Sequence, residues 1–148
     1  MAGGRLMATK WQMALIGFVA GMGVTGVAWA HGDVVPHAVD TAGLPSLGED
    51  LHAEDPYRGT PDYKLAQEIG AKAFNQNCAR CHGLGAVSGG IAPDLRQLVP
   101  VDDDGYFLGR VMSGSIRDGV TYMPPFEGVL SQEAIWSIRS WLDTVAEQ

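Results

Sequence analysis

The pentapeptide Cys78-Ala79-Arg80-Cys81-His82 constrains this chain more than any other stretch. It has the form C-x-x-C-H, in which each thiol can bond to one vinyl group of a porphyrin while the adjacent imidazole reaches the iron. Both of the chain's 2 cysteines lie in it. A disulfide, a thioredoxin-like redox pair or half of a zinc site could use the same cysteines. A redox pair requires a βαβ context and a zinc site requires more ligands, so the pattern favours covalent attachment of one haem c.

The first thirty residues have the pattern of an export signal. Arg5 and Lys10 precede an apolar segment, and this segment ends in a small-x-small cleavage pattern at residues 28–30. The rival interpretation is an uncleaved membrane anchor over residues 11–30, but glycines interrupt that segment. We therefore expect residues 1–30 to be a signal peptide cleaved after Ala30. The mature protein would then be periplasmic, without stable membrane insertion.

The chain that remains after such a cleavage is acidic. The full sequence has 10 Lys and Arg against 17 Asp and Glu, and loss of Arg5 and Lys10 leaves 8 against 17, a formal charge of −9. Such a charge disfavours binding to nucleic acid or to anionic membrane surfaces. It favours solubility and would attract a basic protein partner.

Residues 31–59 are expected to form an extended acidic arm, and residues 60–148 a single small domain. Proline and glycine recur throughout the arm, and no helical periodicity runs through it. Three histidines lie along it: His31, His37 and His52. A new N-terminal amine and His31 could form a surface metal site. Solvated or hydrogen-bonded histidines are the simpler explanation.

The first helix of the domain is expected to lead directly into Cys78. Thr60 can cap it, Pro61 suits its first helical position, and apolar residues then recur at helical spacing. Gly70 lies near the apolar face, where it costs about 1 kcal/mol of helix propensity relative to alanine. We therefore expect another helix to approach closely at Gly70.

Two further helices are expected after the pentapeptide. The acidic triplet at residues 102–104 suits the start of a short helix that closes at Gly114. The final helix begins at Ser131 and carries one apolar stripe. Trp136 lies well off this stripe, so its indole ring is expected to cover a loop or the surface instead of the first helix.

Two residues outside the pentapeptide are candidates for the surroundings of the iron. A ligating imidazole usually donates its second N–H to a carbonyl group, and Pro93 could supply that carbonyl or merely stiffen the loop. The second axial ligand would be Met, His or Tyr. Beyond residue 30 the methionines are Met112, in the second predicted helix, and Met123, which two prolines follow. We favour Met123, because those prolines fix an extended backbone that can hold a thioether against iron.

The order of these motifs resembles that of class I cytochromes c, from Thr60 to the C-terminus. The motifs are a helix with Gly70 and Phe74, then CARCH, GGIAPDL, YMPPF and a terminal helix with Trp141. The resemblance implies an all-α fold of short helices around one covalently bound haem, with the first and last helices crossing at Gly70. It also implies the roles of the site residues: thioethers at Cys78 and Cys81, proximal ligand His82, its ring partner the Pro93 carbonyl, and distal ligand Met123.

A narrower resemblance covers most of the chain after the predicted signal. HGDVVPHAVDT, DPYRG, NCARCHGL, SGGIAPDL and YMPPFEGVLSQEAIW are similar to segments of the soluble cytochromes c that accept electrons from PQQ-dependent (quinoprotein) alcohol dehydrogenases. This implies a single-electron carrier, not an enzyme, that passes electrons to a terminal oxidase or another cytochrome. The alternatives are a peroxidase-like haem subunit with an open distal iron site, and a sensor or structural subunit. Candidate donors to the haem propionates are Arg96, Tyr106, Arg110 and Tyr122.

Overall fold

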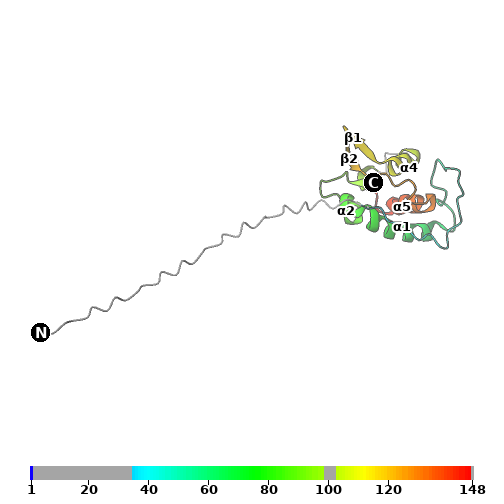
Figure 1. Cartoon of the computed structure of the whole chain (residues 1–148). Helices are drawn as coiled ribbons and strands as arrows, with labels where there is room; N and C mark the ends of the chain where they lie inside the picture. The colour runs from blue at the N-terminus through cyan, green and yellow to red at the C-terminus, as the bar shows by residue number, and fades with distance from the viewer. Residues whose placement is uncertain (2–34, 99–102, 148) are drawn as a thin grey trace. The chain divides into compact units, whose positions relative to one another are not determined.

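Helices predominate in the structure, a computed structural model that describes Met1 and residues 35–98 and 103–147 (Figure 1). The elements are α1 (Tyr63–Asn77), α2 (Ala79–His82), the 3-10 helix η1 (Leu84–Ala86), α3 (Leu95–Leu98), α4 (Asp104–Ser113), β1 (Ser115–Arg117), β2 (Val120–Met123) and α5 (Gln132–Val145). This content is compatible with the predicted all-α class. The predicted signal peptide lies outside the described residues. None of the helices in the described ranges has the length and apolar character needed to cross a membrane.

The centre of the fold is the packing of α1 against α5, two helices that lie together in Figure 1. A Cβ atom placed on Gly70 would lie 1.8 Å from the carbonyl oxygen of Ser137. One turn further along each helix, the Phe74 and Trp141 rings pack with their centroids 4.6 Å apart and their planes inclined by 41°. The expected close approach at Gly70 is thus confirmed.

Helix α1 begins two residues later than predicted, at Tyr63 instead of Pro61, and Thr60 does not cap it. The Thr60 hydroxyl donates instead to the Tyr57 carbonyl oxygen at 2.7 Å, and the Thr60 carbonyl accepts from the Tyr63 N–H at 3.2 Å. Pro61 therefore lies in a turn. The physical reason is the burial of Tyr57, which is 2% exposed: the chain must leave this anchor through a turn before a helix can start.

Helix α4 begins and ends as predicted within the described residues, and helix α5 begins as predicted. The Asp103 carboxylate accepts from the Tyr106 N–H at 2.5 Å, and Gly114 closes α4 with a positive φ of 68°. The Ser131 hydroxyl accepts from the Ala134 N–H at 3.3 Å at the start of α5. Trp136, which was expected to cover a loop or the surface, is fully buried.

A two-stranded antiparallel hairpin of β1 and β2 was not predicted. Its turn is Asp118-Gly119, in which both residues have positive φ, the conformation that two-residue hairpin turns require. A bulge lies between Ser115 and Ile116, and Ser115 pairs with Met123. The hairpin therefore fixes Met123 beside the end of α4.

The arm over residues 35–59 has no helix or strand, and hydrogen bonds join it to α5. The Gln132 side chain accepts from the His52 N–H at 2.6 Å, donates to the Asp50 carbonyl at 3.0 Å and accepts from the Trp136 indole N–H at 3.2 Å. The Glu133 carboxylate accepts from the Leu47 N–H at 2.8 Å. The arm thus covers the start of α5, on the side where Trp136 is buried.

The metal site considered for the arm has no support in the described ranges, which contain no group of three His, Cys, Asp or Glu side chains that could hold an ion. His31 lies outside these ranges.

Candidate haem centre

The C-x-x-C-H pentapeptide lies at the junction of α1 and α2. Helix α1 ends at Asn77, and the Cys78 N–H still donates to the Phe74 carbonyl at 2.8 Å. The next turn is α2, closed by the His82 N–H donating to the Cys78 carbonyl at 2.9 Å. Because Cys78 and Cys81 lie one helical turn apart, their side chains project from the same face of that turn.

No disulfide joins Cys78 and Cys81, and the surroundings of Cys78 do not favour a redox nucleophile. Burial, aided by the neighbouring Cys81, raises the pKa of the Cys78 thiol to about 12. A thioredoxin-like pair requires a thiol whose pKa is lowered, because the thiolate is the reactive form. No βαβ unit surrounds the pair in the described residues. The redox-pair alternative is therefore disfavoured.

The His82 ring is held by the loop that follows it. Its Nδ1 atom lies 2.9 Å from the Pro93 carbonyl oxygen, a hydrogen bond in which Nδ1–H donates. The loop itself is tightly folded: a Cβ atom on Gly83, whose φ is +80°, would lie 1.8 Å from the Val87 carbonyl oxygen. With Nδ1 engaged, Nε2 is the ring nitrogen that can bind a metal.

Met123 ends β2, and the backbone on both sides of it is anchored to the end of α4. A Cβ atom on Gly114 would lie 2.4 Å from the Met123 carbonyl oxygen. Beyond the two prolines, the Phe126 N–H donates to the Val111 carbonyl at 3.1 Å. The Glu127 N–H also donates to the last turn of α4, at Met112. The Met123 segment and the end of α4 therefore form one rigid unit.

Several apolar side chains, some of them from the pentapeptide and from β2, pack on the core but are only partly buried. They come from separate segments of the chain: Cys78, Ala79, Leu95, Phe107, Met112 and Met123. Such side chains leave an apolar surface that a flat hydrophobic group can cover. A porphyrin is such a group, and the free thiols and the oriented imidazole supply its attachment and a ligand. The residues present fit a haem.

Three of the four candidate propionate donors already have partners within the protein. The Arg96 guanidinium pairs with Asp94 at 2.8 Å and with Glu147 at 2.7 Å. The Arg110 guanidinium donates to the Gly114 carbonyl at 3.0 Å and to the Tyr106 hydroxyl at 3.1 Å. The Tyr122 side chain is exposed, and the described structure does not select one donor among the four.

One contact beside the pentapeptide was missed by the sequence reasoning. The Asn77 side chain accepts from the His37 N–H at 2.7 Å and donates to the Ala73 carbonyl at 3.3 Å. The arm is thus tied to the residue that immediately precedes Cys78. No sequence signal marks this contact, because the two residues are forty positions apart.

Comparisons with known proteins agree with this centre. The family model "Cytochrome C oxidase, cbb3-type, subunit III" matches residues 66–142. The chain is 53% identical to cytochrome c550 of Pseudomonas aeruginosa over 129 residues, 86% of this chain and 89% of that protein. It is 41% identical over 75 residues to quinohemoprotein alcohol dehydrogenase ADH-IIG of Pseudomonas putida, covering 51% of this chain and 10% of that protein. It is also 31% identical over 96 residues to the cbb3-type cytochrome c oxidase subunit FixP of Rhizobium meliloti, covering 57% of this chain and 32% of that subunit. No solved structure matches.

The chain belongs to the class I cytochrome c family. Its cofactor is one covalently bound haem c, for which Cys78 and Cys81 stand in the attachment positions. The protein is accordingly a monohaem electron carrier.

Proposed function

We propose that this protein carries single electrons from a PQQ-dependent alcohol dehydrogenase to the respiratory chain in the periplasm, after cleavage of a signal peptide at Ala30. Its haem would be joined to Cys78 and Cys81 and ligated by His82 and Met123. The bound haem supplies a one-electron couple of iron, and the protein supplies attachment, burial and a docking surface.

The observation that carries the proposal is the hydrogen bond between His82 Nδ1 and the Pro93 carbonyl. It fixes the ring orientation and the tautomer, leaves Nε2 for the iron, and makes the imidazole a stronger donor. Such an arrangement holds a permanent ligand, so that His82 remains on the iron in both oxidation states. This suits a carrier, because electron transfer is fastest when few atoms move.

Met123 is proposed as the sixth ligand because its backbone is fixed on both sides. A ligand on a rigid segment loses little conformational entropy when it binds. Thioether ligation opposite a histidine raises the reduction potential. With both axial positions filled, a substrate finds no open iron site, which disfavours the peroxidase-like alternative.

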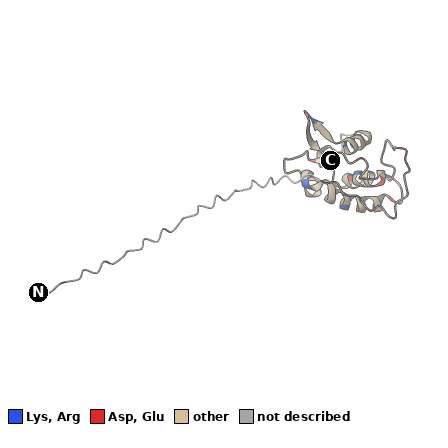
Figure 2. Cartoon of the chain, viewed as in Figure 1, with Lys and Arg blue, Asp and Glu red and all other residues tan. Residues whose placement is uncertain are grey.

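The proposed donor is supported by similarity, and the charge of this chain bears on how a partner would approach it. Quinohemoprotein alcohol dehydrogenase ADH-IIG contains a segment similar to half of this chain, which links a domain of this kind to a quinoprotein alcohol dehydrogenase. The mature chain would carry a charge of −9, although Figure 2 shows basic residues at α2 and at the tip of the hairpin. We expect long-range attraction between the acidic chain and a basic partner, whereas Arg80 and Arg117 would attract acidic groups of that partner locally.

Stopped-flow mixing with a reduced quinoprotein alcohol dehydrogenase tests this role. We expect haem reduction with a second-order rate constant that falls as ionic strength rises, because surface charges are screened. The control is the same carrier mixed with the oxidised dehydrogenase, which should give no reduction. Failure of the reduced enzyme to transfer electrons at a useful rate would remove it as the donor and leave the family assignment intact.

Gly114→Ala is expected to weaken the Met123–iron bond. Alanine at a φ of +68° is strained, and its Cβ would overlap the Met123 carbonyl oxygen, so the segment must shift. We expect the far-red ferric band associated with sulfur ligation to lose intensity, and the protein to lose about 2–3 kcal/mol of stability. Absorption spectra and denaturant unfolding measure both effects.

Gly128→Ala is the matched control for Gly114→Ala. Its φ of +77° is equally strained, but a Cβ there meets nothing within 4 Å. It should cost only the backbone strain, about 1 kcal/mol, and leave the spectrum unchanged. Equal spectra for the two variants would contradict the positioning role assigned to Gly114.

A further inference from the structure

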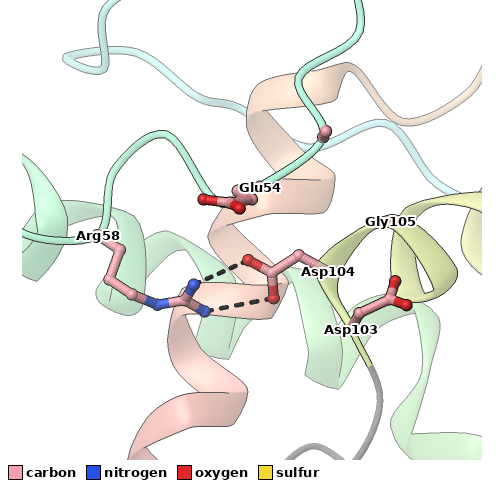
Figure 3. Close-up of a pocket in the computed structure, with 6 residues that line it drawn as sticks. Glu54, Arg58, Asp103, Asp104 and Gly105 are labelled. Carbon is pink, nitrogen blue, oxygen red and sulfur yellow. Dashed lines mark hydrogen bonds and ion pairs between the residues drawn. The ribbon is translucent and has the colours of Figure 1, made fainter.

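Four side chains from three segments form a closed ring of ion pairs. Arg58, in the arm, pairs with Asp104 at 2.8 Å and with Asp143 at 3.0 Å. Arg139 pairs with Asp104 at 2.8 Å and with Asp143 one turn along α5. Figure 3 shows the Arg58 guanidinium facing the Asp104 carboxylate. Both residues line a hollow of about 560 Å³. The ring joins the arm, the start of α4 and α5.

Asp104 is the buried centre of this ring. Its side chain is 8% exposed, and it accepts from Arg58, from Arg139 and, at 2.9 Å, from the Asp55 N–H. Burial alone would raise the pKa of Asp104, but these donors hold it below its ordinary value. Loss of one donor from a buried carboxylate is costly, because the remaining charge is left partly uncompensated.

Asp104 is also the first residue of α4, and the last turn of α4 is the anchor of Met123. The ring therefore holds one end of a ten-residue helix, and the other end holds the candidate ligand. At 1.5 Å per residue this helix is about 15 Å long. A helix of this length moves as a rigid rod, so a shift at Asp104 moves the Gly114 contact as well.

Helix α4 has few other attachments to the rest of the domain in the described ranges. It packs on α5 much less extensively than α1 does, and its buried apolar side chains are Leu108 and Val111, each 7% exposed. The Arg139 guanidinium also lies 6.0 Å from the centre of the Phe107 ring. The ring of ion pairs is thus a principal constraint on where α4 lies.

We propose that Arg58 is a positioning residue for the sixth ligand, acting through Asp104 and α4 on Met123. Weakening the ring lets α4 and the Met123 segment move together away from the haem. The thioether then leaves the iron more often, and an external ligand gains access. The inference rests on the proposed ligation of the iron by Met123.

The test is imidazole titration of the ferric holoprotein, followed by loss of the far-red band. Apparent affinity for imidazole rises in proportion to the fraction of molecules with an open sixth position. For Arg58→Gln we expect the apparent dissociation constant to fall about tenfold, equivalent to ~1.4 kcal/mol. Arg58→Lys keeps the charge but cannot bridge two carboxylates as a planar fork, so its constant should fall only about threefold.

Glu133→Ala is the control, because it removes a different contact between the arm and α5 and leaves the ring intact. It should lower the denaturant midpoint without changing imidazole affinity. If Arg58→Gln lowers the midpoint but binds imidazole as the wild type does, the ring is merely structural and the inference is overturned. If the Arg58→Gln protein cannot be prepared with haem attached, the Arg58→Lys variant decides. The inference is then overturned if the apparent dissociation constant of Arg58→Lys for imidazole equals that of the wild type.

The proposed function is checked first in the same titration. A wild-type protein without the far-red band, or a Met123→Ala variant that keeps it, shows that Met123 is not the ligand. Either result is visible before any Arg58 variant is compared, and the inference then falls together with the ligand assignment.

Discussion

Replacement of Met123 by alanine is expected to abolish the far-red ferric band and to lower the reduction potential by about 0.1 V or more. The physical reason is that a thioether stabilises the ferrous state, and alanine leaves the sixth position to water or to an external ligand. Absorption spectroscopy and a redox titration measure the two effects. The reduced variant should also bind small ligands that the wild-type protein excludes.

Met112→Ala is the control for that experiment. Met112 lies in the last turn of α4 and is partly buried against the core. Its loss should cost about 2 kcal/mol or more of stability through lost packing while leaving the far-red band intact. If the band vanished in Met112→Ala and persisted in Met123→Ala, the assignment of the ligand would be reversed.

Gly70→Ala is expected to cause a large loss of stability, at least about 3 kcal/mol, or to prevent folding. The added Cβ would lie 1.8 Å from the Ser137 carbonyl oxygen and 2.9 Å from the Trp141 Cβ atom. The first contact is with backbone, so no rotamer change can relieve it. Helices α1 and α5 would have to separate and uncover the core between them. Denaturant unfolding of the purified protein measures the loss.

Gly109→Ala is the matched control, because it makes the same change inside helix α4. A Cβ on Gly109 meets nothing within 4 Å, so only helix propensity changes, and alanine should stabilise by about 0.5–1 kcal/mol. Opposite signs for the two substitutions would show that Gly70 is required by packing. A mild effect of Gly70→Ala would mean that α1 and α5 are not in such close contact.

The parts of the fold that the sequence predicts well are those encoded locally. Ser131 and Gly114 mark helix ends through their own side chain or backbone freedom, and the helices they bound were placed correctly. The close approach of two helices was predicted from Gly70 alone. Glycine lowers helix propensity, so its presence inside a helix indicates a packing requirement. The position of Pro93 next to His82 Nδ1 agrees with the sequence hypothesis, while the ligand roles of His82 and Met123 remain predictions.

The hairpin and the ring of ion pairs were not predicted, for two different physical reasons. The hairpin strands are short and largely exposed, so no alternating apolar pattern marks them, and only Asp118-Gly119 could have indicated the turn. The ring of ion pairs joins Arg58 to residues 46 and 85 positions away. In a sequence such charges are indistinguishable from solvated ones, because only the folded chain brings them together.

The covering of α5 by the arm has a consequence for the order of events during synthesis. The arm leaves the ribosome early, whereas Gln132 and Glu133, which bind it, belong to the last helix to be made. Contacts between such distant parts of a chain form late in folding. Until then, α5 does not hold the arm against the domain, and the segment that carries both thiols stays open to the machinery that joins the porphyrin to it.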